Sequence, residues 1–268
     1  MRRTSSKSSS TQVPHTPSGT AWLGAGLGAI VATLVFAPAA WLSRGVDAAT
    51  GGRVLLAEPV GSVWRGSAQL FLTGGQGTQD AASLPGRVNW RLSPTWRGLN
   101  MALDLPCCAT QPVQLTLTPG WQRAGVQINA PAVNLPAQWL SGLGAPWNTL
   151  GPAGQLTLSA PTLQLDWAAG RVAMQGNAQL DLLDMSSRLS TLSPLGDYRL
   201  LLSGGDVPAI NLQTLQGALQ LSGSGQIVGS RIRFAGEASA AQGSEAALGN
   251  VLNIIGRRQG AKSLITLG

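Results

Sequence analysis

QLTLSAPTLQLDW, residues 155–167, is the stretch that decides the fold class, because apolar and polar side chains alternate in it. Leu156 and Leu158 flank Thr157, and from residue 163 to residue 167 leucine, leucine and tryptophan alternate with glutamine and aspartate. Successive side chains of a β-strand point to opposite faces of a sheet. The stretch therefore predicts strand structure with one apolar and one polar face.

The same period of two residues returns along most of the chain beyond residue 60. Strands with one polar face favour antiparallel sheets. We therefore predict a mainly β domain with an antiparallel, curved or groove-like sheet of about ten strands that grows by hairpins. Gly176 interrupts one long stretch and predicts a bulge or bend there. The further alternating stretches are 64–72, 88–92, 99–105, 113–118, 126–128, 172–182, 198–202, 219–221 and 232–234.

Two stretches depart from this period. Residues 136–150, PAQWLSGLGAPWNTL, are apolar without a clean repeat and predict a short helical turn or a loop over the sheet. Near the C-terminus, Ser244 predicts the cap of a short helix that Gly256 ends, and residues 263–267 predict a final strand. The apolar face predicted for this helix consists of Leu248, Val251, Leu252 and Ile255.

The N-terminal apolar segment, AWLGAGLGAIVATLVFAPAAWL, spans residues 21–42 and contains no charged side chain. About 20 apolar helical residues cross the hydrocarbon core of a bilayer, and Trp22 and Trp41 would then reach the two headgroup regions. We predict a single transmembrane helix over 21–42. Three alternatives stay open: a buried core helix, a signal peptide cleaved near Ala37-Pro38-Ala39, and a twin-arginine export signal at Arg2-Arg3.

Charge sets the expected orientation of this helix. Arg2, Arg3 and Lys7 precede it, and the first twenty residues hold no acidic side chain. Cationic flanks stay in the cytoplasm. We therefore predict a disordered cytoplasmic leader over 1–20, a periplasmic β-rich domain over 43–268, and a single-pass protein of the bacterial inner membrane.

The composition argues against a nucleic-acid-binding protein. Charged side chains make up only 11% of the chain, whereas 44% of the residues are hydrophobic, which is enough for a core. The leader holds three of the 18 basic residues and none of the 11 acidic ones, so the rest of the chain carries only +4. The arginines are spread mostly singly, so binding of nucleic acid is not expected.

The exported part holds few of the residues that catalysis or metal binding requires. The single histidine, His15, lies in the leader, so no histidine-dependent nucleophile is expected beyond it, and Lys262 is the only exported lysine. We expect no enzymatic activity, no metal and no cofactor. Cys107 and Cys108 are adjacent; they form a vicinal disulfide, pair with another chain, or remain two thiols.

One group of aromatic and basic residues is a candidate contact surface. Trp64, Arg65, Trp90 and Arg91 combine the residue types that are enriched at binding hot spots. The alternative interpretation places both tryptophans in the core and both arginines over its rim.

A second basic pair follows the predicted C-terminal helix. Arg257 and Arg258 would lie near the negative end of the helix dipole and stabilise it there. The alternative is that the pair docks to an acidic partner or to a lipid headgroup. Both residues are therefore retained as candidate contact residues.

A resemblance to a known family rests on five blocks of the sequence. They are GSVWRGSAQL (61–70), LPGRVNWRLSP (84–94), SPLGDYRL (193–200), RIRFAGEASA (231–240) and NVLNIIGRRQGAKSLITLG (250–268). Together these blocks resemble type II secretion system protein N, the GspN family. The last block is the most specific, and the resemblance covers nearly the whole exported chain.

The resemblance implies an accessory inner-membrane component of the machinery that exports folded proteins across the outer membrane. Such a component is expected to dock other type II secretion components of the inner membrane, or the secretin. The family's β-rich part is also suspected to be akin to AsmA-like grooves, which implies the alternative of a periplasmic lipid-binding or lipid-transfer groove in contact with inner-membrane lipid. The resemblance supplies no catalytic residues.

Overall fold

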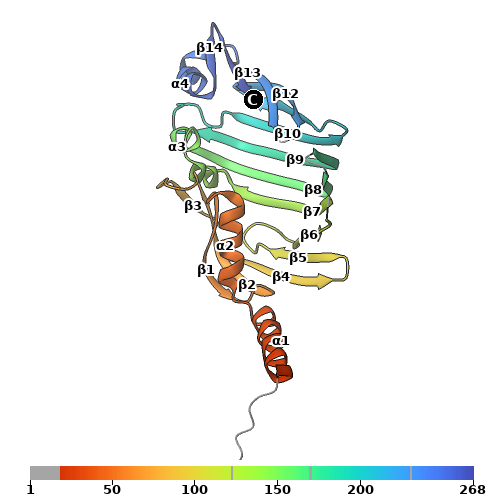
Figure 1. The fold of residues 1–268 in the computed structure, drawn as a ribbon. Coiled ribbons are helices and arrows are strands. Elements are labelled where there is room, and N and C mark those ends of the chain that lie inside the picture. The colour runs from red at the N-terminus through yellow and green to blue at the C-terminus, as the bar shows by residue number, and fades with distance from the viewer. Residues whose placement is uncertain (1–18, 122, 169–170, 230) are drawn as a thin grey trace, which may run out of the picture. The chain divides into compact units, whose positions relative to one another are not determined.

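The computed structural model of the chain describes residues 19–121, 123–168, 171–229 and 231–268 (Figure 1). The chain divides into two units, Met1–Ala37 and Pro38–Gly268. All the strands lie in the second unit.

The N-terminal apolar segment forms two helices, not one. Helix α1 (Gly19–Val35) ends before Pro38, and α2 (Ala39–Thr50) follows it. Proline has no N–H donor and its ring clashes with the carbonyl four residues earlier. The prediction of one uninterrupted helix over 21–42 is therefore wrong. No helix in the described part of the chain has both the length and the apolar content to span a membrane, so the transmembrane prediction is not confirmed.

The predicted disordered leader, residues 1–20, lies outside the described residues except for its last two positions. Gly19 and Thr20 are helical and begin α1, so the prediction is wrong for these two residues. The described side chains of α1, from Trp22 onward, are exposed and uncharged.

The second unit is built on one open sheet of fifteen strands. The strand order is β1-β2-β4 and then follows the sequence to β13, with β15 and β14 at the end and β3 beside β2. All pairs are antiparallel, which confirms the mainly β, antiparallel prediction. The strands are β1 (Val54–Gly61), β2 (Arg65–Thr73), β3 (Ala81–Ser83), β4 (Val88–Thr95), β5 (Gly98–Asp104), β6 (Val113–Thr118), β7 (Arg123–Pro136), β8 (Pro152–Ala168), β9 (Arg171–Ser187), β10 (Gly196–Gly205), β11 (Ala209–Gly217), β12 (Leu219–Val228), β13 (Arg231–Ala240), β14 (Arg257–Gln259) and β15 (Lys262–Leu267).

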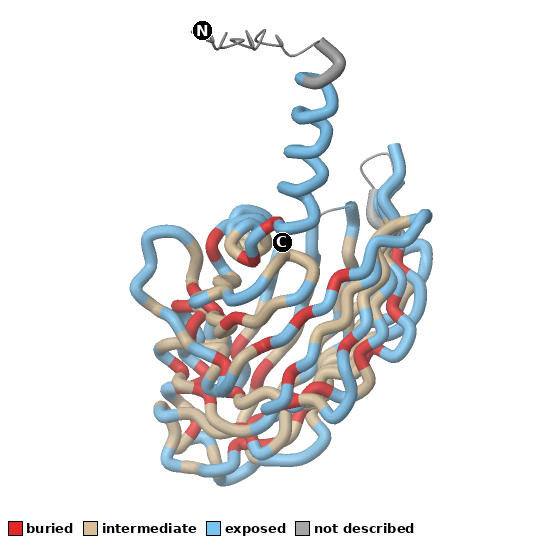
Figure 2. Tube along the Cα trace, turned by 90° about the horizontal axis from the view of Figure 1, so that it is seen from below, coloured by how far each residue is buried: buried red, intermediate tan, exposed pale blue. Residues whose placement is uncertain are grey.

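The strand register joins the apolar positions of neighbouring strands into rows on one face of the sheet. Leu92 is paired with Met101, Met101 with Leu115, and Leu115 with Ile128, which is paired in turn with Leu163. In Figure 2 buried segments recur at intervals along the strands, as this alternation requires. We call this side of the sheet the apolar face, and the opposite side the polar face.

The helical segments pack on the apolar face. Ala39 of α2 is buried with Ala68 and Trp90. The 3-10 helix η1 (Ala137–Leu143) and helix α3 (Trp147–Leu150) contribute to the cores of the middle strands, which confirms the helical turn predicted for this region.

Helix α4 (Glu245–Ile255) confirms the predicted C-terminal helix, and Leu248, Val251 and Leu252 are buried. One detail of the prediction is wrong, because the side chain of Ser244 makes no capping hydrogen bond. Arg257 and Arg258 follow the helix end directly and belong to strand β14, and their stabilisation of the helix dipole stays a prediction.

The long central strands are bent where their registers shift. The pairing of β7 with β8 shifts between Ile128 and Val133, and the pairing of β8 with β9 shifts between Ser159 and Gln164. The pairing of β9 with β10 shifts between Ser203 and Gly205. Bulges bend strands and increase their twist, so this line of irregularities curves the sheet. Gly176 lies on it at φ +84°, which confirms the bulge predicted there.

We expect Gly176→Ala to lower the free energy of unfolding by about 3 kcal/mol. A side chain is strained at a positive φ, and at this crowded position it would also clash with its neighbours. A Cβ atom at Gly176 would lie 1.7 Å from the carbonyl oxygen of Thr162. Thermal and urea unfolding of the full chain, followed by circular dichroism, measures the loss.

Gly229→Ala is the matched control. Gly229 has φ +64°, but no described atom lies within 4 Å of the new Cβ. The control should therefore lose only about 1 kcal/mol. Equal losses in the two variants would show that the bulge does not constrain the sheet.

Candidate functional site

Trp64 and Trp90 belong to the core, as the second interpretation of this group predicts. The Trp90 side chain is only 4% exposed. Its Nε1–H donates to the carbonyl oxygens of Ser62 and Val63 at 3.2 and 3.1 Å. Trp64 packs half-buried against the same cluster. Trp90, one of the two tryptophans of the candidate contact surface, is therefore not available to a partner.

Arg65 and Arg91 lie directly opposite each other on β2 and β4. Both are exposed on the polar face, because the core residue Trp90 alternates with Arg91. Together with Asn89 and Asp104 they line a hollow of about 310 Å³. None of the three ion pairs among the described residues includes Arg65 or Arg91. We call these two residues the arginine pair.

Asp181 and Arg199 form a second outward cross-strand pair in the same sheet. In this pair the two charges are opposite and form an ion pair. Arg199 Nε and Nη2 donate to the two carboxylate oxygens of Asp181 at 2.7 and 3.1 Å. The hydrogen bond from Arg199 holds the pKa of Asp181 below its ordinary value, and the hydrogen bond to Asp181 raises the pKa of Arg199. Each charge thus stabilises the other.

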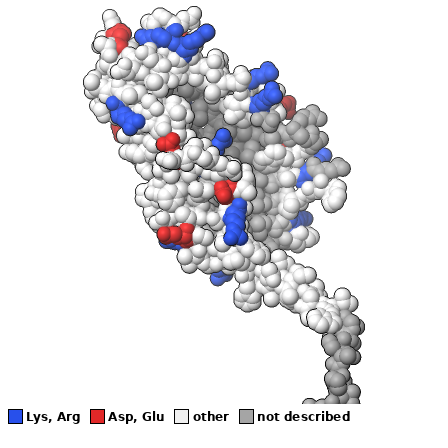
Figure 3. Space-filling model, turned by 60° about the vertical axis from the view of Figure 1, so that its left-hand side comes forward, with Lys and Arg blue, Asp and Glu red and all other residues white. Residues whose placement is uncertain are grey.

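Neither residue of the arginine pair has such an ion pair among the described residues, although Asp104 lines the same hollow. Like charges directly opposite on neighbouring strands are unfavourable, by up to about 1 kcal/mol. Two guanidinium groups at one place can bind a carboxylate or phosphate through several charge-assisted hydrogen bonds. Charged side chains are few and scattered on the face that Figure 3 shows. Two arginines in register can therefore bind one anionic group together.

Arg257 and Arg258 do not join this site. They lie in β14, which is at the other end of the strand order from β2 and β4. Both are exposed, and Arg258 Nε donates to the carbonyl oxygen of Gly260 at 2.9 Å. The six candidate contact residues thus form two separate groups.

The sulfur atoms of Cys107 and Cys108 are joined in a disulfide. Cys108 is buried, and its carbonyl oxygen accepts a hydrogen bond from the Asn134 N–H at 2.6 Å. Ala109 also forms a bridge with Val133. The cysteine pair therefore lies in a connection that is fastened to β7.

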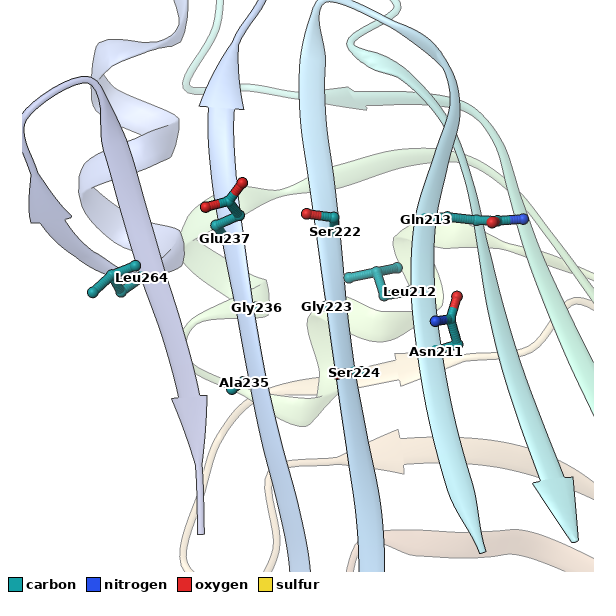
Figure 4. A pocket seen from close by; sticks show the side chains of 10 residues that line it. All are labelled: Asn211, Leu212, Gln213, Ser222, Gly223, Ser224, Ala235, Gly236, Glu237 and Leu264. Carbon is teal, nitrogen blue, oxygen red and sulfur yellow. The ribbon is translucent and has the colours of Figure 1, made fainter.

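A second hollow, of about 570 Å³, lies on strands β11, β12, β13 and β15 (Figure 4). The register brings Gln213, Ser222, Glu237 and Leu264 side by side across it. Glu237 is paired with Lys262 at 2.9 Å. Sequence reasoning did not find this hollow, because the register between strands is not visible in a single sequence.

Tyr198 is a titratable residue whose pKa is strongly shifted by its surroundings. Its ring is buried, and burial raises the pKa of its hydroxyl well above the ordinary value. The hydroxyl has no hydrogen-bond partner among the described residues. A permanently protonated, unpartnered phenol beneath the sheet contributes packing and offers no acid–base chemistry at neutral pH.

On strand β8 the apolar face becomes more exposed away from the helical segments. On β8, Leu163 is 7% exposed, Leu165 is half-buried, and Trp167 is 42% exposed. Met101 and Leu103 on β5 are also half-buried on this face. Part of the apolar face is therefore covered by protein and part is accessible.

These surfaces define an open single-sheet β-protein with accessible groups on both faces. A scan against protein-family models matches residues 52–264 to the type II secretion system (T2SS), protein N. Because the match covers most of the chain, the chain belongs to the type II secretion system protein N family, and the resemblance seen in the sequence is confirmed. A search of curated proteins and a search of solved structures each found no match.

The Asp181–Arg199 pair predicts a pH-dependent stability difference. The pKa of Asp181 is lowered by folding, so the pair stabilises the protein above the unfolded-state pKa, and this stabilisation disappears as the pH falls through the lowered value. We expect Asp181→Asn to be less stable than the wild type at pH 7. The difference should vanish at the lowest pH at which both remain folded.

Urea unfolding at a series of pH values measures this difference. Asp206→Asn is the control, because Asp206 is exposed and takes part in none of the ion pairs among the described residues. A difference between Asp181→Asn and the wild type that stays constant with pH would show that the carboxylate charge of Asp181 is not what stabilises the sheet.

Proposed function

We propose that this protein is an accessory, non-catalytic component of the type II secretion machinery that acts by docking other secretion proteins in the periplasm. Its partners are other inner-membrane components of the machinery or the secretin. The observation that carries the proposal is the arginine pair, two outward guanidinium groups in register that take part in none of the ion pairs of the described residues. A carboxylate-bearing segment of a partner matches this pair in charge and geometry.

We further propose that the N-terminal apolar segment anchors the protein in the inner membrane with the second unit in the periplasm. Helix α1 supports this, because its described side chains are uncharged and exposed. An exposed apolar surface of this kind calls for cover by lipid or protein. The basic residues Arg2, Arg3 and Lys7 ahead of α1 favour a cytoplasmic N-terminus.

The docking proposal predicts opposite effects of one substitution on stability and on function. Arg91→Glu places a carboxylate opposite Arg65, so the free energy of unfolding should rise by up to about 1 kcal/mol. The same change should weaken docking of an acidic segment by about tenfold or more, because like charges then face each other across the interface. Urea unfolding, crosslinking in cells and the secreted enzymes in the medium provide the three measurements.

Arg53→Glu is the control, because Arg53 is also an exposed arginine outside the ion pairs of the described residues but precedes β1. It should leave the capture of identified secretion components and the secretion level unchanged. Unaltered capture and secretion in Arg91→Glu would refute docking through the arginine pair.

The second candidate function is a lipid-binding or lipid-transfer groove. The observation that favours it is the accessible part of the apolar face, where Met101, Leu103 and Leu165 are half-buried. An acyl chain laid along this face would bury apolar surface that the protein leaves accessible, at about 25 cal/mol per Å². This candidate requires no contact with the arginine pair.

Neighbouring residues of β5 separate the lipid function from the docking function. We expect Met101→Glu to remove co-purifying lipid from the full chain, since the carboxylate would meet the acyl chains. Asn100→Glu is the control, because Asn100 is exposed on the polar face of the same strand. Native mass spectrometry and lipid extraction measure the bound lipid, and equal lipid content in both variants would exclude a groove at this position.

A further inference from the structure

The connections between strands differ in kind at the two ends of the strands. From β4 to β13 the strands follow each other in the sheet in sequence order and antiparallel, so every second connection lies at the same end. One end carries the 3-10 helix η1, helix α3 and the cysteine-containing connection. Among the described residues, the other end carries only residues 96–97, 119–121, 206–208 and 229 between its strands. We call this second end the hairpin rim.

Figure 1 shows the β4–β5 hairpin at the right-hand ends of its strands, whereas α3 lies at the left. The surface at one end of the strands therefore differs from the surface at the other end.

The hairpin rim gathers exposed apolar side chains. Among the described residues of the second unit, seven of the twelve exposed large apolar side chains lie at or beside these hairpins. Trp96 is 89% exposed and Trp121 is fully exposed, each in a different connection. The remaining five residues are Trp167, Val207, Val228, Ile232 and Leu267. Grouped at one end of the strands, these seven side chains form an exposed apolar surface of the kind that marks an interaction site.

Basic side chains accompany these apolar residues. Arg97, Arg123, Arg231 and Arg233 are exposed at the same rim, and none takes part in the ion pairs of the described residues. The guanidinium carbon of Arg97 lies 4.6 Å from the centre of the Trp96 ring.

Acidic groups are fewer at the rim. Among the described residues Asp206 is exposed there, and Asp166 is half-buried and accepts a hydrogen bond from Gln164 at 2.9 Å. The rim is thus apolar and net positive at once.

We propose that the hairpin rim docks onto the surface of a bilayer that contains anionic phospholipids. Tryptophan side chains favour the headgroup region, where an apolar ring and an N–H donor are both accommodated. Arginines beside them attract anionic headgroups, each by a factor of about five near the surface. Several separate turns in a line, each with one or two apolar residues, fit a deformable plane better than a matching pocket on a protein. The inference does not depend on docking through the arginine pair.

Photocrosslinking of the full chain tests this inference. The chain is reconstituted in vesicles of phosphatidylcholine with phosphatidylglycerol, with a photoreactive phenylalanine at position 96, 121 or 147. Trp147 is the control site, because it is also an exposed tryptophan but lies in α3 at the other end of the sheet. We expect phospholipid adducts at positions 96 and 121 and none at position 147.

Charge dependence provides the second arm of the experiment. Arg97→Gln with Arg123→Gln should lower the adduct yield at position 121 by about 25-fold, and vesicles of phosphatidylcholine alone should lower it at least as much. Arg53→Gln with Arg188→Gln removes the same charge from two exposed arginines outside the rim and should leave the yield unchanged.

Equal lipid yields at positions 121 and 147, or no lipid adduct at 96 and 121, would overturn the proposal. Adducts in cells at 96 and 121 that contain a protein and no lipid would also overturn it, in favour of an acidic protein partner. A loss of secretion in Arg91→Glu with unchanged lipid adducts would support the docking proposal and leave the inference about the rim unaffected.

Discussion

The burial of one face of a single sheet is the constraint on which the rest of this structure depends. A sheet without a second sheet against it must cover its apolar side with helices, connections, a partner or lipid. Here α2, η1, α3 and α4 cover part of the apolar face. The chain offers no further described element for the remainder, so Leu165 and Trp167 stay partly or largely exposed. The accessible apolar surface is a consequence of the architecture.

The line of register shifts has a second consequence. A flat sheet of fifteen strands would present its apolar face without any shelter, whereas bulges at Ile128–Val133 and Ser159–Gln164 curve the central strands. Gly176 permits the curve because only glycine accepts both the positive φ and the close approach of the Thr162 carbonyl. Curvature and partial cover together determine which part of the apolar face a ligand could reach.

The sequence allowed the fold class and most strands to be predicted, because a period of two residues is a local signal. Strands β3 and β14 have three residues each and are too short to show it. In β1, Glu58 at φ 48° and Pro59 break the alternation. Strand β11 places Thr214 on the apolar face, where its hydroxyl and the Leu221 backbone exchange hydrogen bonds at 2.9 and 2.6 Å. Pro38 is a local signal for a helix break, but the uncharged apolar run of residues 21–42 favoured the prediction of one continuous helix.

The candidate site was less predictable because it depends on contacts between strands. Trp64, Arg65, Trp90 and Arg91 were identified by residue type, yet only the register shows that the two arginines oppose each other while Trp90 lies beneath them. Arg257 and Arg258 were assigned to a helix end because a helix and its terminal dipole can be recognised locally. The hairpin of β14 and β15 carries both arginines and is held by the pairing of β15 with β13. Such pairing cannot be recognised from the local sequence.

The edges of the sheet leave the faces and the hairpin rim as the available interaction surfaces. An open sheet has two edge strands whose unpaired N–H and C=O groups can bind another strand. At one edge, the bulge between Ala57 and Val60 and the ring of Pro59 interrupt the hydrogen-bonding row of β1. At the other edge, β14 offers three residues, two of them arginines. Neither edge presents a long regular row, so a partner of this protein is expected to bind through side chains on the polar face, the apolar face or the rim.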